Sequence, residues 1–367
     1  MTRTIDSQYG KIEPMLAALE ALVRAESPSE DLEACRNVVI LAADIATRLL
    51  GTPAQIKEVE GRPVFWWGAE KPEIVLLAHL DTVWPKGSFD PLWQVDGDVL
   101  RGPGTFDMKA GFVQALYALQ GIEGSVALIG TTDEEIGSHA SRALISDLAR
   151  NSKAVLVLES AIDGKLKTGR KGTSMYQIIV HGRAAHAGLE PETGINATVE
   201  IAHIITALSA LENKEHGTTV VATSLHSGTT TNTVPEKAIL DIDARSFSTA
   251  EQERVDKAIK GIRGLHPEVK IEVIGGINRP PMEPSSANEL YERAERVAAS
   301  IGMGPFGSAQ VGGASDGNIA AATGAKVLDG LGAVGAGAHA HNEWVSVKAL
   351  EERSRFLHAY IKDLLHG

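Results

Sequence analysis

Short apolar runs alternate with longer amphipathic stretches in the first and last parts of the chain. The runs cover 74–78, 126–130, 154–158 and 326–328. Runs of this length between helix-like segments predict buried parallel strands, because a strand covered on both faces shows no polar alternation. Helices are expected at 13–25, 31–50, 109–120, 139–150, 286–301, 315–323 and 347–365. This order predicts a doubly wound α/β domain with a mainly parallel sheet.

The middle of the chain follows a different pattern. Strands are expected at 173–181, 218–226, 236–245 and 269–275, and helices at 195–211 and 249–263. The order β-α-β-β-α-β is the ferredoxin-like split motif. The stretch "DIDAR" alternates polar and apolar residues, as a half-exposed strand does. We therefore expect an α+β lid and dimerisation domain at 172–281, inserted into a catalytic domain formed by 1–171 and 282–367.

Composition narrows the class of protein. A chain of 367 residues favours two domains, and 43% hydrophobic with 22% charged residues is ordinary for a globular protein. The formal net charge of -12 argues against nucleic-acid and anionic-membrane partners, which need a basic surface. Cys35 is the single cysteine, the N-terminal stretch resembles a helix more than a signal peptide, and no apolar run could span a bilayer. We expect a cytoplasmic location.

Acidic and histidine residues follow the predicted parallel strands. Those at strand ends are His79, Asp81, Glu134, Glu135, Glu159 and, beyond a glycine-rich loop, His339. Asp107 lies in a further loop just before a helix. Ligands of open α/β sheets bind at the carboxyl ends of the strands, so we expect these side chains to converge there.

Imidazoles and carboxylates without cysteine suit zinc or a similar transition metal. A pair of metals about 3.5–4 Å apart needs one shared carboxylate and further ligands on each metal. His79 and His339 would supply one imidazole per metal, Glu135 and Glu159 one carboxylate per metal, and Asp107 the bridge. Two Zn²⁺ are therefore expected as cofactors, with Co²⁺ or Mn²⁺ as alternatives.

Two acidic residues remain for other roles. Asp81 lies two residues from His79 on the same strand face and would orient its imidazole. Glu134 would point away from Glu135 in an extended segment and could act as the general base on the bound water. Each residue also has an ordinary structural interpretation: His79 and Asp81 could satisfy each other, Glu134 and Glu135 could form a solvated turn, and carboxylates such as Asp107 often cap helices or turns. Their joint occurrence at the strand ends favours the metal.

Seven segments together resemble one enzyme family. They are "HLDTVWPKG", "GPGTFDMKAG", "TTDEEIGS", "LVLES", "GRAAHAG", "GGASDGN" and "GAHAHNEW". In this order they resemble the motifs of acetylornithine deacetylase, succinyl-diaminopimelate desuccinylase and glutamate carboxypeptidase, which are dinuclear zinc amidohydrolases. The resemblance runs from about residue 75 to 345, and "HLDTVWPKG" is most similar to the glutamate carboxypeptidase branch.

The resemblance implies the same metal ligands and base, and a cis peptide bond after Asp107. It also implies that His186 stabilises the oxyanion in the partner subunit's active site of a homodimer. Asn232 and Arg245 would hold the substrate carboxylate, although each could instead serve a turn or a strand ion pair. The loop 312–317, with Gly312 and Gly313, would line the same pocket.

Two features depart from a simple match. His341 occupies a position where many relatives have proline, so the choice of His339 rests on its four-residue spacing to Glu343. The stretch "GLGAVG" fits a dinucleotide-binding pattern but leads into another glycine-rich segment where that motif opens a helix. The task of Trp84 stays open.

The expected reaction is hydrolysis of an amide beside a free carboxylate, with a small peptide or an N-acyl amino acid as substrate. The favoured version is a carboxypeptidase that releases a C-terminal amino acid such as glutamate. An N-acyl-amino-acid deacylase or dipeptidase on the same scaffold is the alternative. A non-catalytic binding or assembly protein is a distant third hypothesis, since a binding protein would not require Glu134.

Overall fold

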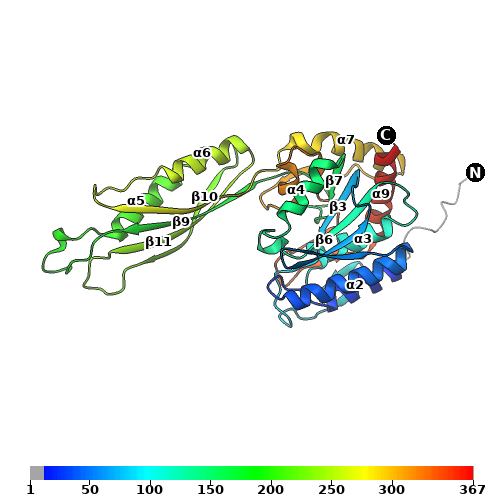
Figure 1. The fold of residues 1–367 in the computed structure, drawn as a ribbon, viewed down its shortest axis with the longest axis horizontal. Coiled ribbons are helices and arrows are strands. Elements are labelled where there is room, and N and C mark those ends of the chain that lie inside the picture. The colour runs from blue at the N-terminus through cyan, green and yellow to red at the C-terminus, as the bar shows by residue number, and fades with distance from the viewer. Residues whose placement is uncertain (1–11, 367) are drawn as a thin grey trace, which may run out of the picture. The chain divides into compact units, whose positions relative to one another are not determined.

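The computed structural model describes residues 12–366, and contacts between residues divide this chain into two compact units (Figure 1). Unit 1 comprises 12–169, Pro284–Val311 and 315–366 of the described residues. Unit 2 comprises Arg170–Glu283 together with Gly312–Ala314. The expected insertion, 172–281, lies inside unit 2. The loop 312–314, which we expected within the catalytic domain, groups with unit 2. Arg170 and Arg245 donate hydrogen bonds to the carbonyl groups of Gly313 and Gly312 in this loop.

Unit 1 is built on a six-stranded sheet with the order β1-β2-β6-β3-β7-β14. Its parallel part consists of β6 (Val126–Thr131), β3 (Ile74–His79), β7 (Ala154–Val157) and β14 (Val327–Leu328). Every residue of these four strands is buried, which explains their unbroken apolar runs. The antiparallel pair β1 (Gln55–Val59) and β2 (Arg62–Gly68) extends the sheet beyond β6.

Helices flank this sheet in two groups. The first group contains α1, α3 and α9, which pack against one another, and in the second α4 packs against α8. The helices of unit 1 are α1 (Ile12–Arg24), α2 (Leu32–Leu50), α3 (Ala110–Ala118), α4 (Arg142–Asn151), α7 (Pro284–Ser300), α8 (Asp316–Ala321) and α9 (Val347–His366). The mixed α/β class with a mainly parallel sheet is thus confirmed.

Two small sheets accompany the main one. The larger has the order β15-β16-β5-β4, and the smaller pairs β13 with β8. Their strands are β4 (Gln94–Asp96), β5 (Val99–Arg101), β8 (Leu166–Arg170), β13 (Ser308–Val311), β15 (Gly335–Ala336) and β16 (Trp344–Ser346). The sequence did not predict them, because two to five residues are too few to show a periodic pattern.

Unit 2 has the expected order β-α-β-β-α-β. Its elements are β9 (Gly172–His181), α5 (Ala197–Ser209), β10 (Thr219–Ser227), β11 (Lys237–Ser246), α6 (Thr249–Lys260) and β12 (Lys270–Arg279). The strands form an antiparallel sheet in the order β10-β11-β9-β12. Asn196 caps α5 by accepting hydrogen bonds from the backbone of Thr198 and Val199.

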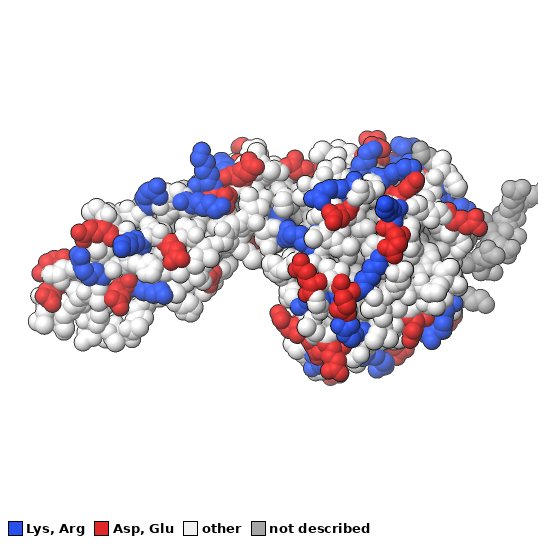
Figure 2. Space-filling view, viewed as in Figure 1, with Lys and Arg blue, Asp and Glu red and all other residues white. Residues whose placement is uncertain are grey.

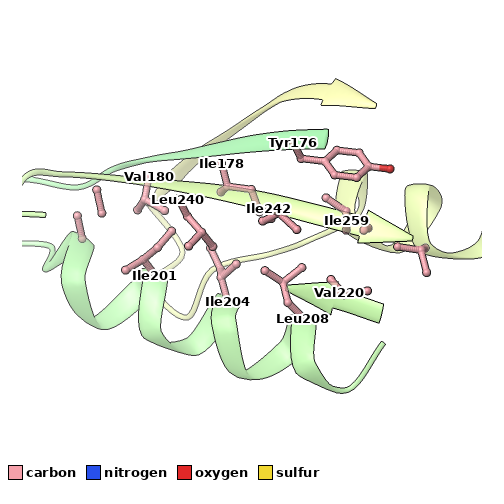
Figure 3. Close-up of a cluster of buried hydrophobic side chains, with 14 residues drawn as sticks. Tyr176, Ile178, Val180, Ile201, Ile204, Leu208, Val220, Leu240, Ile242 and Ile259 are labelled. Carbon is pink, nitrogen blue, oxygen red and sulfur yellow. The ribbon is translucent and has the colours of Figure 1, made fainter. Parts of the chain in front are cut away.

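A separate hydrophobic core holds unit 2 together. In Figure 3, Ile201, Ile204 and Leu208 project from α5 toward the strands, in the three- and four-residue spacing of one helix face. The inward residues of the strands that face them include Ile178 and Leu240, which alternate with more exposed neighbours. Unit 2 therefore has the core expected of an independent domain.

The surface and the helices agree with the composition. Lys, Arg, Asp and Glu side chains are interspersed on the face shown in Figure 2, which carries no continuous basic surface among the described residues. Among residues 12–366, no helix is both long enough and apolar enough to cross a bilayer.

Candidate metal centre

Three adjacent parallel strands end at one edge of the unit 1 sheet, and the predicted ligands follow them. His79 is the last residue of β3 and pairs in register with Thr131, the last residue of β6. Glu134 and Glu135 begin the short helical turn η2 (Glu134–Ile136) just after β6. Glu159 comes two residues after β7. The parallel arrangement therefore brings together residues that are up to 80 positions apart in the sequence.

Asp107 lies between two imidazoles. Its Oδ1 is 3.1 Å from His79 Nε2, and its Oδ2 is 3.3 Å from His339 Nε2. Asp107 belongs to the turn η1 (Thr105–Lys109), where its backbone is not helical and the bond to Met108 is cis, as the resemblance implied. Because each carboxylate oxygen faces a different imidazole, Asp107 has the orientation that a bridging ligand requires.

A second carboxylate accompanies each imidazole. Glu159 Oε1 is 3.7 Å from His79 Nε2, and Glu135 Oε2 is 3.0 Å from His339 Nε2. Ligand atoms of His79, Asp107 and Glu135 all lie within 4.8 Å of one another. The five predicted ligands thus form two imidazole–carboxylate pairs, one on each side of Asp107.

The electrostatics of this cluster fit a divalent cation. Burial alone would raise the pKa of Asp107, but hydrogen bonds from His339 and His79 hold it well below its usual range. The same contacts with Asp107 and Glu135 raise the pKa of His339, and burial raises the pKa of Glu135. The free cluster therefore retains protons to balance its carboxylates. Metal ions would take over this balancing charge, so the donor set fits the expected metals.

Asp81 contacts His79 more closely through its backbone carbonyl than through its carboxylate, which was the expected contact. His79 Nδ1 lies 3.0 Å from the backbone carbonyl oxygen of Asp81 and 3.5 Å from its carboxylate Oδ1. The carboxylate Oδ2 accepts hydrogen bonds from Ser29 Oγ (2.7 Å) and from the backbone N–H of Glu135 (3.2 Å). The carbonyl group thus makes the shorter contact with the imidazole, while the carboxylate fixes the segment that carries Glu135.

Glu134 is buried, at 8% exposure, and directly precedes Glu135. Its carbonyl oxygen accepts a hydrogen bond from Gly137 N (2.9 Å), which closes the tight turn after β6. Gly137 has a φ of 100°, a value that favours glycine. The "DEEIG" sequence therefore forms a fixed turn, in contrast to the solvated turn that was its ordinary interpretation.

The structure separates the two histidines of "HAHNE". His339 Nε2 faces Asp107 and Glu135. The ring of His341 instead packs against Trp84, with 4.8 Å between ring centroids, and against Phe89, with 5.9 Å. The geometry therefore favours His339 as the ligand and places Trp84 in an aromatic cluster.

Glu343 is a site residue whose role the sequence did not reveal. Its side chain is fully buried, and burial raises its pKa to about 7. It accepts hydrogen bonds from the backbone N–H groups of Phe106 and Asp107 and from the indole of Trp84. The available signal is an acidic residue four positions after His339. This spacing supports the choice of His339 but does not show what the carboxylate contacts.

The remaining predicted site residues lie in unit 2, where they form two local groups. His186 pairs with Thr233, and the next residue, Ala187, donates its N–H to the Asn232 carbonyl (2.9 Å). Arg245 forms a two-pronged ion pair with Asp243, at 2.8 and 3.0 Å.

The second group, which Arg245 and Asp243 form, also contains the glycine loop 312–314. Arg245 Nη1 donates to the carbonyl of Gly312 (3.1 Å), and the buried Arg170 donates to that of Gly313 (3.0 Å). The strand ion pair, which is the ordinary structural interpretation of Arg245, is therefore present. The arginine also contacts the loop expected to line the substrate pocket.

A cavity of about 510 Å³ opens beside Glu135 in unit 1. Pro28, Val83, Pro85 and Ile136 are among its lining residues. Hydrogen bonds join its two walls: Lys86 Nζ donates to Asp31 (2.7 Å), and Ser29 N donates to the Thr82 carbonyl (3.1 Å). The cavity is thus preformed and has the size of a small-molecule site.

Comparison with known proteins identifies the family. The model of peptidase family M20/M25/M40 matches residues 75–363. The chain belongs to this family. As a member of the M20/M25/M40 peptidases it is a metal-dependent hydrolase, which confirms the resemblance and the enzyme class expected from the sequence.

The similar proteins within the family are named as different enzymes. The chain is 31% identical over 312 residues to carboxypeptidase G2 of Pseudomonas sp. (strain RS-16), covering 80% of this chain and 74% of that protein. It is 27% identical over 369 residues to a succinyl-diaminopimelate desuccinylase of Psychromonas ingrahamii, covering 92% and 95%. The fold is shared with the aminopeptidase PepT of Bacillus cereus, with a TM-score of 0.76, 23% identity and coverage of 98% and 100%.

Proposed function

We propose that this M20/M25/M40 peptidase uses two zinc ions to hydrolyse an amide beside a free carboxylate, as a carboxypeptidase. The observation that carries the proposal is the position of Asp107, whose two carboxylate oxygens face His79 and His339 separately. Glu159 and Glu135 then complete one ligand pair each. Co²⁺ or Mn²⁺ could replace zinc, since the donor set suits all three ions.

The protein side of the mechanism starts with Glu134. Metal ions at such a site polarise a carbonyl group and lower the pKa of bound water toward ~7. Glu134 takes a proton from the attacking water and delivers it to the leaving amide nitrogen, as a general base and then a general acid. Asp81 acts in support, because it holds both His79 and the backbone of Glu135 in place.

Substrate recognition is assigned to unit 2. Arg245 and Asn232 would bind the free carboxylate, with Gly312 and Gly313 lining the pocket. His186 would stabilise the oxyanion of the partner subunit in a homodimer. The contact between Arg245 and the Gly312 carbonyl supports this grouping, since it brings the arginine to the loop.

The cavity beside Glu135 gives room for the acyl side of the substrate. The similarity to carboxypeptidase G2 favours release of a C-terminal amino acid, glutamate being the first to test. An N-acyl-amino-acid deacylase is the second candidate, because desuccinylases also match along most of the chain. We place the enzyme in the cytoplasm, where its single, fully buried cysteine, Cys35, would stay reduced.

Replacement of the proposed base tests the mechanism. We expect Glu134→Gln to lower kcat by about a hundredfold to ten-thousandfold, while the metal content stays at two ions per chain. Activity would be measured on N-acyl-glutamates and dipeptides with metal-loaded enzyme, and metal content by elemental analysis. The matched control is Glu123→Gln, which changes an exposed glutamate of unit 1.

Two results would contradict the proposal. One is full activity of Glu134→Gln, and the other is a wild-type protein that takes up no metal. The substrate panel separates the two candidate reactions, since a deacylase would prefer short acyl groups over dipeptides.

A further inference from the structure

The carboxylate of Glu343 accepts four hydrogen bonds from two different segments. Its Oε1 accepts from the backbone N–H groups of Phe106 (2.8 Å) and Asp107 (3.1 Å). Its Oε2 accepts from the backbone N–H of Gly104 (3.1 Å) and from Trp84 Nε1 (3.1 Å). The side chain has no exposed surface. Each oxygen thus receives two N–H donors, which is what a carboxylate removed from water requires.

Three of these donors belong to the loop that presents Asp107. Gly104 begins this loop, and the N–H of Asp107 itself is among the donors. The cluster of N–H groups needs an acceptor oxygen at both positions, because an apolar side chain, or an amide with a single acceptor oxygen, would leave buried donors unsatisfied. Glu343 therefore fixes the backbone from which the proposed bridging ligand projects.

The same residue is tightly linked to His339. Ala340 N donates to the Gly337 carbonyl and Glu343 N donates to the Ala340 carbonyl, both at 2.9 Å. A side chain at Gly337 would come within 2.9 Å of the Glu343 Cα, so this loop closes on itself. The segment from Gly337 to Glu343 is therefore a compact turn that carries a ligand at one point and the carboxylate at another.

Strand pairing anchors this turn beside the Asp107 loop. Trp344, the residue after Glu343, starts β16 and pairs with Arg101 at the end of β5. Arg101 is three residues before Gly104. The pairing of β16 with β5 thus places Glu343 next to the N–H groups from which it accepts hydrogen bonds.

We propose that Glu343 is a positioning residue that sets the spacing between Asp107 and His339 and so prepares the metal site. The inference rests on the proposed two-metal function and deepens it. Glu343 is not one of the five proposed ligands; it acts through the loop of Asp107 and through the turn that carries His339. Because it also holds the indole of Trp84, the aromatic cluster with His341 and Phe89 is fixed by the same carboxylate.

Glu343→Gln is the most informative variant. Glutamine has nearly the same shape, but it replaces one acceptor oxygen by an NH₂ group, which would face two N–H donors at close range. The Asp107 loop or the His339 turn must then move. We expect the dissociation constants for Zn²⁺ and Co²⁺ to rise about tenfold to a hundredfold, as for other groups that orient metal ligands. The site formed by His339 and Glu135 should weaken more than the site formed by His79 and Glu159.

A matched control separates positioning from stability. Glu295 also accepts two backbone N–H bonds, from Phe306 (3.2 Å) and Gly307 (2.8 Å), and it belongs to unit 1. Glu295→Gln makes the same chemical change away from the ligands. A purely structural role of Glu343 predicts that both variants lower the melting temperature of the metal-free protein and that neither changes metal affinity.

A milder variant covers the case in which Glu343→Gln does not fold. Trp84→Phe keeps an aromatic ring and removes one of the four donors, and we expect it to raise the Zn²⁺ dissociation constant a few-fold. The experiment titrates metal-free full-length protein with Zn²⁺ against a chelating indicator, and with Co²⁺ by visible absorption, which reports the coordination of each site.

The outcomes are distinct. Weaker metal binding in the Glu343→Gln and Trp84→Phe proteins, with wild-type affinity in Glu295→Gln, supports the inference. Two tightly bound metals in every variant would overturn it and leave the proposed function standing. A wild-type protein that binds no metal would overturn the proposed function, and the positioning role with it.

Discussion

At the scale of single residues, the main property of the site is the negative charge of its clustered carboxylates. Asp107, Glu135 and Glu159 bring three carboxylates together beside His79 and His339. Hydrogen bonds with Asp107 and Glu135 raise the pKa of His339. Without metal, protonated histidines therefore balance the charge of the carboxylates. The same residues that bind the proposed metals therefore bind protons in their absence, and the two must compete.

This competition predicts a pH dependence of metal binding. At pH 7 His79 and His339 both retain a proton, because hydrogen bonds with the neighbouring carboxylates raise the pKa of each imidazole. Metal binding must displace these protons, so we expect about two protons to be released per chain at pH 7 and the apparent affinity to increase as the pH rises. Calorimetric titrations in buffers of different ionisation enthalpy measure the number released. An affinity that does not change between pH 6 and 8 would contradict this prediction.

At the scale of elements, the loops between strands decide the geometry. The turn that carries His339 depends on Gly337, whose φ is 86° and whose added Cβ would meet the Glu343 Cα at 2.9 Å. The turn η1 that carries Asp107 depends in turn on the N–H groups bound by Glu343. The strands therefore place the site, while these two turns adjust the distances between its ligands.

A pair of glycine variants tests the role of the His339 turn. Gly337→Ala and Gly324→Ala both introduce a side chain at a left-handed backbone, with φ of 86° and 84°, which costs about 1–2 kcal/mol each. Only Gly337 has a close neighbour, because nothing lies within 4 Å of the Cβ position at Gly324. We expect Gly337→Ala alone to weaken metal binding. Equal metal affinities in the two variants would show that the turn does not control the site.

At the scale of the whole molecule, the two compact units carry different parts of the proposed function. The five predicted metal ligands all lie in unit 1, and unit 2 has a core of its own formed by α5, α6 and the sheet. Stability of unit 2 and metal affinity of unit 1 should therefore respond to different substitutions.

A core substitution in unit 2 tests this separation. Leu208 is 1% exposed and belongs to the core of unit 2, so Leu208→Ala should cost about 2–5 kcal/mol of unfolding free energy. Metal affinity should stay at the wild-type value. Thr206→Ala, on the exposed side of the same helix, is the control and should change stability by at most about 0.5 kcal/mol. Denaturant unfolding and metal titration measure the two quantities, and a parallel loss of both would show that the units depend on each other.

Replacement of His186 tests the proposed contribution of unit 2 to catalysis. If it stabilises the oxyanion, His186→Ala should lower kcat by about a hundredfold to a thousandfold. The metal content should not change, because His186 lies in unit 2. His203→Ala replaces an exposed histidine of α5 and serves as the control. A loss of metal content equal to the loss of turnover would point to a structural role.

The long elements could be predicted from the sequence because burial leaves a local pattern. The unbroken apolar runs of β3, β6 and β7 follow from burial on both faces, and the face of α5 with Ile201, Ile204 and Leu208 follows from helical spacing. The convergence of the proposed ligands was predictable for a related reason. Parallel strands end at one edge, so polar residues after each of them meet there.

Contacts between distant segments left no such pattern in the sequence. Glu343 accepts a hydrogen bond from the N–H of Asp107 across 236 residues, and the sequence shows only an acidic residue four positions after His339. The contact between the Asp81 carbonyl and His79 likewise depends on the folded path of the chain. The same is true of the grouping of loop 312–314 with unit 2.

The sequence by itself predicted the fold class, the order of most long elements, though not β1 and β2, and the convergence of histidines and carboxylates at one edge of the sheet. Each of these follows from local periodicity and from the direction of parallel strands. Only the tertiary structure showed that His339 faces Asp107 while His341 packs against Trp84, and only the tertiary structure joined Glu343 to the Asp107 loop. The physical reason is that a hydrogen bond or ring contact depends on positions accurate to within about 1 Å. Such accuracy exists only when the whole chain has packed.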